Sequence, residues 1–293
     1  MKKPFHYCTT DHTILHGTIH SEEGEPLIFL HYMGGNEAIW NGVIPFFIEN
    51  YRVITINLRG HGYSEDRGKG YDFDTLAEDI ALGLDHLGIT AAHFVGSSLG
   101  AYVATSFAAR WPERCLSLVN SEGALQNDTG PGGKFTESKE ERMAKLGSRS
   151  ETTYSSKEAY IQHLKAVWLP WSEVKERTLE GLEVDQREDG RVATKPSHNS
   201  SMQLLEHLFN VQLEDWYTNV QCPVLFLPAE VEGDLEGKLT FIKDKLEPIL
   251  TISKTEVIPG TTHAMMFDHY EEMSHAILSF HKEMTSLSGE LKN

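Results

Sequence analysis

The sequence is poor in three features that would mark other classes of protein. Its three cysteines, Cys8, Cys115 and Cys222, are few and far apart, so it predicts neither a disulfide framework nor a Cys/His zinc site. Its longest apolar runs, such as "PLIFLHY" and "PVLFLP", have the length of a strand and are too short to cross a bilayer. Basic residues number only 26 against 43 acidic ones, a net charge of −17. This charge argues against nucleic acid and other polyanions as partners.

The composition is otherwise that of an ordinary globular chain. Of 293 residues, 40% are hydrophobic and 24% are charged, which is enough apolar material for a sizeable core. The first residues, "MKKPFHYCTTDHT", carry two lysines without the apolar stretch of a secretory signal. We therefore expect a cytoplasmic protein with no membrane association, either a monomer or a homodimer.

Short apolar runs alternate with amphipathic stretches along most of the chain. The runs "TILHGTI", "PLIFLHY", "YRVITINL", "AAHFVGS", "CLSLVNS", "PVLFLP" and "ISKTEVIP" predict strands, and residues 73–87, 99–110 and 268–286 predict helices. Apolar strands separated by helices are typical of a mostly parallel sheet covered on both faces. The predicted fold class is therefore α/β.

The region from about 125 to 218 interrupts this alternation. It begins with the polar, Gly/Pro-rich stretch "QNDTGPGGKFTESKEER" and continues with segments that look helical and carry Trp168, Trp171 and Trp216. We predict a core domain formed by residues 1–124 and 219–293. Residues 125–218 would form a helical lid inserted after the sixth strand and lying over the carboxyl edge of the sheet.

The stretch "HFVGSSLGAYVA" contains the pattern Gly-x-Ser-x-Gly at Gly96, Ser98 and Gly100. The pattern alone is weak, but here a predicted buried strand precedes it and a predicted helix follows at once. A strand–serine–helix turn exposes the serine above the sheet, and its glycines relieve the crowding that this turn creates. Ser98 is therefore the predicted nucleophile.

Four segments in order resemble those of the α/β-hydrolases, in particular the epoxide-hydrolase/esterase-like group with a serine nucleophile. "LHYMGGNEAIW" resembles the oxyanion loop, "INLRGHGYS" the Arg-Gly segment, "VGSSLGA" the nucleophile elbow and "PGTTHAMMFDHYEEM" the histidine segment. Two positions depart from that family's pattern. Tyr32 stands where glycine is usual, and Asn57 replaces an aspartate, which we expect to affect structural support more than chemistry.

The resemblance implies the remaining catalytic groups. His263 follows a predicted strand and a short turn and precedes the last helix, which makes it the predicted base; His31 and His61 match structural positions instead. The oxyanion hole would use the backbone amides of Leu99, the residue after the nucleophile, and of Met33.

The acid of the triad has three candidates. Glu122 ends the predicted strand "CLSLVNS", and a carboxylate at the end of a buried strand is costly unless it is paired or used. Glu232 and Asp234 lie in the acidic loop "AEVEGDLEG", after the strand that usually supplies the acid in this family. We favour Glu122, because zearalenone-type lactone hydrolases are similar in placing a glutamate at this earlier strand.

These residues together predict a serine hydrolase that cleaves a carboxylic ester or lactone through an acyl-enzyme, without a cofactor or metal. Tyr32, Trp168 and Trp171 are the predicted substrate-binding residues, and they favour a bulky apolar small-molecule substrate. A C–C bond hydrolase, amidase, acyltransferase or perhydrolase on the same triad, or a ligand receptor without catalysis, remains an alternative.

Overall fold

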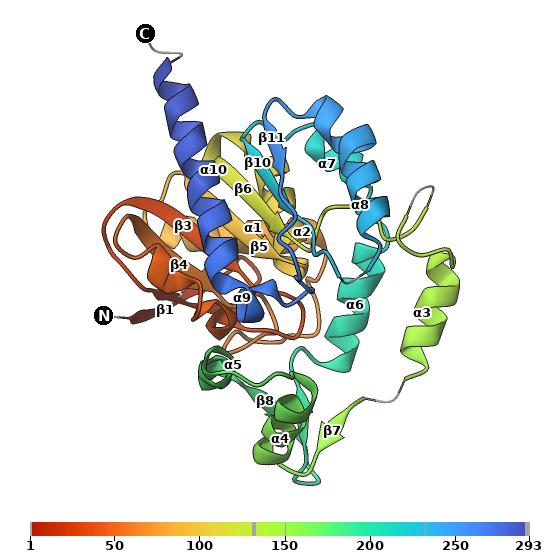
Figure 1. Ribbon diagram of the computed structural model, residues 1–293. Coiled ribbons are helices and arrows are strands. Elements are labelled where there is room, and N and C mark those ends of the chain that lie inside the picture. The colour runs from red at the N-terminus through yellow and green to blue at the C-terminus, as the bar shows by residue number, and fades with distance from the viewer. Residues whose placement is uncertain (1, 131–132, 150, 232, 291–293) are drawn as a thin grey trace.

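The computed structural model describes residues 2–130, 133–149, 151–231 and 233–290. Its centre is an eight-stranded sheet, which Figure 1 shows between its covering helices. The strand order is β1-β2-β4-β3-β5-β6-β10-β11. The pairs β1·β2 and β2·β4 are antiparallel, and every pair from β4 to β11 is parallel. The strands are β1 (Lys3–Cys8), β2 (Ile14–Ile19), β3 (Glu25–Leu30), β4 (Tyr51–Ile56), β5 (Ala92–Ser97), β6 (Cys115–Ser121), β10 (Val224–Leu227) and β11 (Ser253–Thr255).

The apolar strands bury both faces of the sheet because alternate residues point to opposite sides. On β3, Ile28 and Leu30 join one core while Leu27 and Phe29 join the other. The first core is covered by α1 (Phe73–His86) and α2 (Leu99–Arg110), and the second by α9 (Met265–Asp268) and α10 (Tyr270–Glu290). Figure 1 shows α10 on one side of the sheet and α1 and α2 on the other. The predicted α/β fold with helices on both faces is confirmed.

The strand β1 was not predicted. Its sequence, "KPFHYC", buries only one residue fully and pairs with a single neighbour at the edge of the sheet, so it carries little of the apolar signal that marks the central strands.

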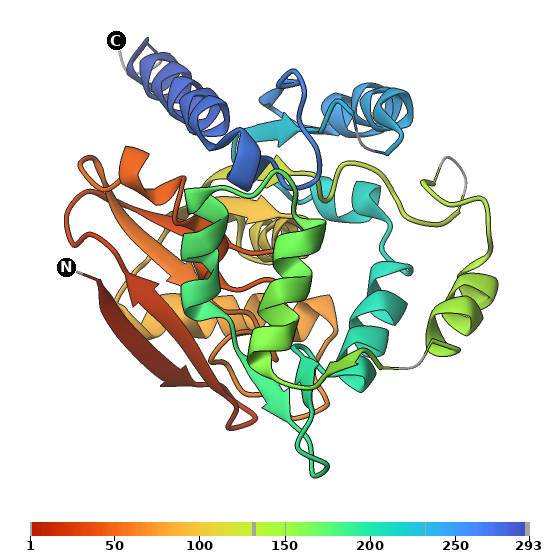
Figure 2. The same ribbon diagram turned by 60° about the horizontal axis from the view of Figure 1, so that its bottom comes forward.

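The strands between β6 and β10 belong to a sheet of their own, and much of this segment lies outside the large sheet, as Figure 2 shows. Its helices are α3 (Lys139–Gly147), α4 (Lys157–Val167), α5 (Glu173–Thr178), α6 (His198–Leu208) and α7 (Leu213–Tyr217). It also contains an antiparallel sheet of β7 (Thr153–Tyr154), β9 (Val192–Thr194) and β8 (Val184–Gln186). This small sheet was not predicted, because strands of two or three residues are too short to show a period in the sequence.

Polar contacts fasten this insertion to the core. The Asp66 carboxylate, in the loop after β4, accepts hydrogen bonds from the Ser200 hydroxyl at 2.7 Å and from the Ser197 amide at 3.2 Å. The Lys195 ammonium donates to the Gly62 carbonyl at 2.9 Å, and the Gln203 amide group donates to the Gly68 carbonyl at 2.9 Å. The loop after β4 is therefore the anchor for the start of α6.

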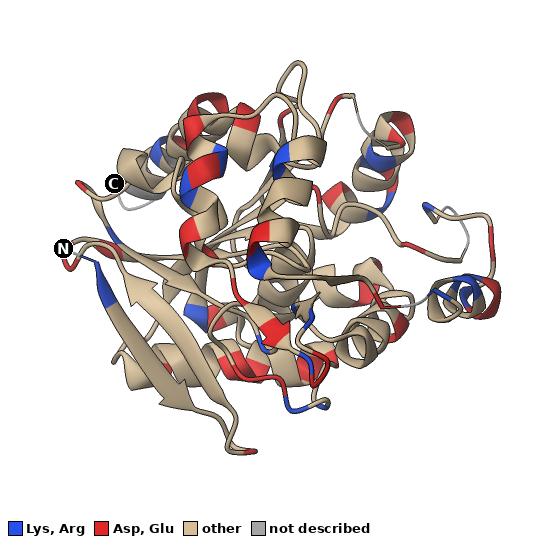
Figure 3. Ribbon diagram, turned by 90° about the horizontal axis from the view of Figure 1, so that it is seen from below, with Lys and Arg blue, Asp and Glu red and all other residues tan. Residues whose placement is uncertain are grey.

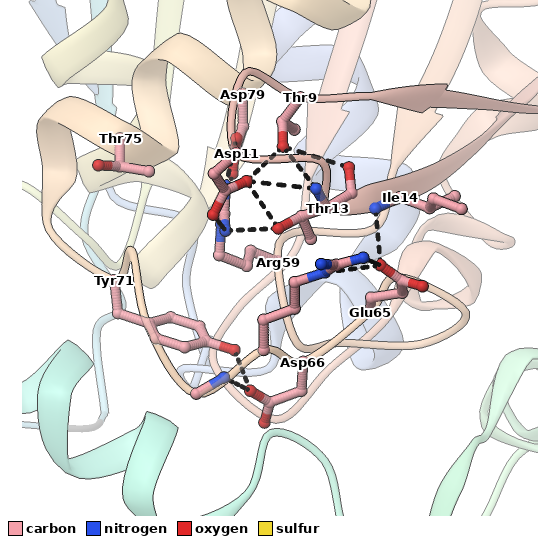
Figure 4. Close-up of polar contacts among 12 residues, drawn as sticks. Thr9, Asp11, Thr13, Ile14, Arg59, Glu65, Asp66, Tyr71, Thr75 and Asp79 are labelled. Atoms are coloured by element: carbon pink, nitrogen blue, oxygen red, sulfur yellow. Dashed lines mark hydrogen bonds and ion pairs between the residues drawn. The ribbon is translucent and has the colours of Figure 1, made fainter.

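A buried arginine, Arg59, connects the same loop to two other parts of the core. The Arg59 guanidinium lies 2.8 Å from both the Asp11 and the Asp79 carboxylates and donates to the Thr13 hydroxyl at 2.9 Å (Figure 4). It ties the turn between β1 and β2, the loop after β4 and helix α1 together. Asn57, the departure from the family pattern, accepts a hydrogen bond from the Glu37 amide at 2.9 Å and so supports the loop after β3.

Within the described residues, none of the helices is both long and apolar enough to cross a membrane. Acidic residues are spread over many of the helices and loops, as the red parts of the ribbon in Figure 3 show.

Candidate active site

Ser98 occupies the sharp turn between β5 and α2. Its backbone has φ 50° and ψ −114°, a left-handed conformation that costs a non-glycine residue about 1–3 kcal/mol. The two pattern glycines allow the turn to close. A Cβ on Gly100 would lie 2.2 Å from the Leu30 carbonyl oxygen, and one on Gly96 would lie 2.5 Å from the Ala101 amide nitrogen. The sequence therefore uses glycine on both sides of the serine because backbone atoms fill the space of a side chain.

The predicted oxyanion donors lie in adjoining segments. Leu99 is the first residue of α2, so its amide is one of the N-terminal donors without an acceptor inside the helix. Met33 lies in the turn closed by the hydrogen bond from the Gly35 amide to the Tyr32 carbonyl, at 3.0 Å. Gly100 packs against the carbonyls of Leu30 and His31, which brings the loop after β3 against the first turn of α2. The oxyanion role of both amides stays a prediction.

The loops after β10 and β11 pack side by side, and His263 lies at the end of the second one. Ala229 and Ile258 form a parallel bridge, and the Thr261 hydroxyl accepts a hydrogen bond from the Glu230 amide at 3.1 Å. His263 follows directly and precedes α9, with 39% of its side chain exposed. An exposed imidazole between fixed loops is available to a substrate.

The two other histidines considered from the sequence are internal. The His31 ring accepts a hydrogen bond from the Leu58 amide at 3.0 Å and contacts the Tyr32 carbonyl at 2.8 Å. The His61 ring contacts the Arg59 carbonyl at 2.9 Å. Burial lowers the pKa of both rings, that of His61 to about 4. Both therefore support loops as neutral side chains.

Glu122 lies beyond the end of β6, where its φ of 49° turns the chain back toward Ser98. Its side chain is only 4% exposed, and its Oε2 lies 3.6 Å from His263 Nδ1. Its Oε1 accepts from the Ala229 amide at 2.8 Å, and the Lys238 ammonium lies 2.6 and 2.8 Å from the two oxygens. Burial raises the pKa of this carboxyl, but the contacts with His263, Lys238 and the Ala229 amide outweigh it and hold the pKa below its ordinary value.

The alternative acids are placed differently. Asp234 is the N-terminal cap of α8 (Leu235–Phe241), and its carboxylate accepts from the Gly237 amide at 2.9 Å. Glu232 lies outside the described residues. Of the two described candidates, Glu122 is the one in contact with His263.

Ser98, Glu122 and His263 line one cavity of about 100 Å³. Polar side chains that sequence reasoning missed share its wall. Among them, Asp128 accepts from the Tyr102 hydroxyl at 3.2 Å, and burial raises the pKa of its carboxyl. No local pattern marked these residues, because each meets the site through the tertiary fold. The remaining lining residues are Tyr102, Gly123, Ala124, Leu125, Gln126, Lys134, Leu208 and Lys238.

The predicted substrate-binding aromatics form a separate cluster with Phe267. Ring centroids are 5.3 Å apart for Trp168 and Phe267, 6.4 Å for Tyr32 and Phe267, and 6.4 Å for Trp168 and Trp171. Phe267 belongs to α9, four residues after His263. These aromatics are not among the described residues that line the Ser98 cavity, and their contact with substrate stays a prediction.

Two further aromatics of the insertion support packing. Phe209 is buried and packs its ring edge-on against Phe135, and Trp216 packs against Phe73 of α1. In the part of the chain that the structure describes, no group of three or more His, Cys, Asp or Glu side chains is arranged to hold a metal ion.

Comparisons with known proteins agree with this fold. Residues 25–160 match the sequence model of the family described as alpha/beta hydrolase fold. A 3-oxoadipate enol-lactonase of Acinetobacter baylyi is 34% identical over 126 residues, 42% of this chain and 47% of that protein. A pimeloyl-[acyl-carrier protein] methyl ester esterase of Aeromonas hydrophila is 36% identical over 114 residues, 38% of this chain and 43% of that protein. The matches span less than half the length of these relatives.

The solved structure of E-2-(acetamidomethylene)succinate hydrolase superposes with a TM-score of 0.77 and 21% identity, over 96% of this chain and 100% of that one. This likeness shows the fold. Together with the match of residues 25–160 to the family model, it shows that the chain has the α/β-hydrolase fold.

Proposed function

We propose that the protein is a serine hydrolase that cleaves a carboxylic ester or lactone. The observation that carries this proposal is the single cavity lined by Ser98 on its strained turn, by His263 and by the buried Glu122 carboxylate that contacts it. A nucleophile, a base and an orienting acid are the three groups that acyl transfer through serine requires.

The reaction would run in two steps. The Ser98 hydroxyl attacks the substrate carbonyl while His263 takes its proton, and the developing oxyanion is held by the Leu99 and Met33 amides. His263 then protonates the departing alkoxide, which leaves an acyl group on Ser98. Water attacks this acyl-enzyme with His263 as base, and the acid is released as Ser98 regains its proton. With a lactone, the leaving alcohol stays attached to the same molecule.

The substrate we propose is a small molecule with a bulky apolar part. The cavity at Ser98 is about 100 Å³, so only the reacting end of such a substrate fits there. The cluster of Tyr32, Trp168 and Trp171 around Phe267 would receive the apolar part. Relatives named as an esterase and an enol-lactonase support the ester and lactone class. Residues 125–218 would act as the lid over a core of residues 1–124 and 219–293.

A panel of chromogenic esters and lactones of increasing acyl size tests this function. We expect turnover by the wild-type protein, labelling of Ser98 by a fluorophosphonate, and a loss of at least about 1,000-fold in kcat/KM for Ser98→Ala. The fold of the variant is checked by circular dichroism.

The other outcomes identify the alternatives. Turnover of β-diketones or amides in place of esters indicates a C–C hydrolase or amidase, and products formed only with an added alcohol or peroxide indicate acyl transfer or perhydrolysis. Equal turnover by Ser98→Ala rules out the serine mechanism. Binding of ligands without any turnover or fluorophosphonate labelling indicates a receptor.

A further inference from the structure

Lys238 is a buried cation in direct contact with the acid of the proposed triad. Its side chain is 6% exposed, and its Nζ lies 2.6 Å from Oε1 and 2.8 Å from Oε2 of Glu122. A buried ammonium is costly to desolvate, and removing its partner is strongly destabilising. The triad chemistry by itself needs no such cation, so the triad alone does not explain why a lysine is buried beside Glu122.

Three neighbours contact the two carboxylate oxygens of Glu122. Oε1 accepts from the Ala229 amide and from Lys238, while Oε2 accepts from Lys238 and faces His263 Nδ1 at 3.6 Å. Because the ammonium bridges both oxygens, it fixes the rotation of the carboxylate plane. The rotation that results is the one that points Oε2 at the imidazole.

We propose that Lys238 is a positioning residue for the Glu122–His263 pair: it orients the carboxylate, keeps it ionised and sets the basicity of His263. This inference rests on the proposed function of the same site. Lys238 acts through Glu122, and we assign it no contact with substrate.

The electrostatic consequence has a definite sign. An ammonium beside the pair opposes the addition of a second positive charge, so it lowers the pH at which the pair takes up a proton. Removing this charge should therefore raise the proton affinity of the pair. At an effective dielectric of about 20, one charge about 4–6 Å away shifts a titration by about two to three pH units.

Other charged groups also face this site. Asp128 and Lys134 line the same cavity from the segment after β6, Asp234 begins the helix that carries Lys238, and Glu230 accepts from the Gly260 amide at 2.7 Å beside the His263 loop. All of them remain when Lys238 alone is replaced. The difference between the variant and the wild type therefore reports the contribution of Lys238.

The test compares Lys238→Met with Lys238→Arg, which keeps the charge, and with Lys243→Met as a control that removes an exposed lysine one turn further on. NMR of the His263 ring as a function of pH follows proton uptake without any substrate. The acid limb of kcat/KM on an ester follows the same event during turnover.

For Lys238→Met we expect proton uptake at His263 and the acid limb to move up by about two pH units, with a larger loss in kcat than any change in KM. Lys238→Arg should stay within about 0.3 pH unit of the wild type, as should Lys243→Met, because the charge beside Glu122 is kept in both. An unchanged titration in Lys238→Met overturns the proposal. So does a uniform loss of rate at every pH with the titration unmoved, since that is a purely structural effect.

If Lys238→Met does not fold, Lys238→Gln takes its place, because it keeps a donor for Glu122 and removes only the charge; the same upward shift is expected. A wild-type protein that turns over no ester refutes the proposed function, while the His263 titration still decides the role of Lys238.

Discussion

Glu122 illustrates how a single residue position combines backbone strain, burial and charge. It lies beyond the end of β6 with a positive φ, next to Gly123, on which a Cβ would lie 2.2 Å from the Ser98 carbonyl oxygen. The chain after β6 is therefore pressed against the turn that carries the nucleophile. This contact places the carboxylate of one strand end beside the serine of its neighbour, since β5 and β6 are paired in the sheet.

The roles of the two described acidic candidates can be separated by Glu122→Gln and its matched control Asp234→Asn. Glu122→Gln keeps the shape but removes the charge that stabilises the imidazolium, so we expect kcat to fall about 1,000- to 10,000-fold. Asp234→Asn should keep kcat within about twofold, because asparagine also caps a helix well. Steady-state kinetics on one ester measures both. Near-normal turnover in Glu122→Gln would indicate that the acid of the triad lies in the loop after β10 instead.

At the scale of elements, the start of α6 depends on the loop after β4. Burial raises the pKa of the Asp66 carboxyl, but hydrogen bonds from Ser200, from the Gly68 amide and from Tyr71 outweigh it and lower the pKa to about 2. A carboxyl with a depressed pKa stabilises the fold above its unfolded value near 4. That stabilisation is lost as the pH falls from about 4 through about 2.

Asp66→Ala tests this anchor. We expect the melting temperature to fall by about 2–6 °C at pH 7 and by less near pH 2.5, where the wild-type carboxylate is itself becoming protonated. Cleavage within the insertion by a trace of protease should become faster than cleavage of the core. Glu188→Ala, at an exposed position in the turn between β8 and β9, is the control and should change neither. Equal protease sensitivity of Asp66→Ala and the wild type would show that Asp66 does not hold the insertion.

At the scale of the whole molecule, Arg59 connects three parts of the chain that are remote in sequence. Its guanidinium is 1% exposed and binds Asp11 from the β1–β2 turn and Asp79 from α1, while the residue itself belongs to the loop after β4. The loop that anchors the insertion thus rests on a buried ionic cluster (Figure 4). The stability of this cluster is a property of the complete fold.

Arg59→Met should lower the stability of the whole protein, because it leaves the buried Asp79 carboxylate without its cation. The expected loss is about 3–5 kcal/mol, which corresponds to a fall of about 5–10 °C in melting temperature. Arg67→Met, which removes an arginine from an exposed pair with Glu65 at 3.1 Å, should change it by less than about 2 °C. Thermal unfolding followed by circular dichroism measures both. A melting temperature as high as the wild type's in Arg59→Met would refute this role.

The sequence by itself determined the α/β fold class, seven of the eight strands in the large sheet and the helix after Ser98. These are encoded in local patterns: apolar runs buried on two faces, a 3.6-residue period and a serine between glycines. It also led to Glu122 and His263, since a carboxylate and an imidazole at the carboxyl ends of parallel strands meet at one edge of the sheet.

Only the tertiary structure decided which side chains surround them. Lys238 meets Glu122 across 116 residues, and Asp128 meets Tyr102 across 26, so no local pattern could reveal either contact. The small sheet in the insertion depends on pairings between strands too short to have a period. The sequence predicts what each segment can bury, whereas long-range packing determines which charges meet inside.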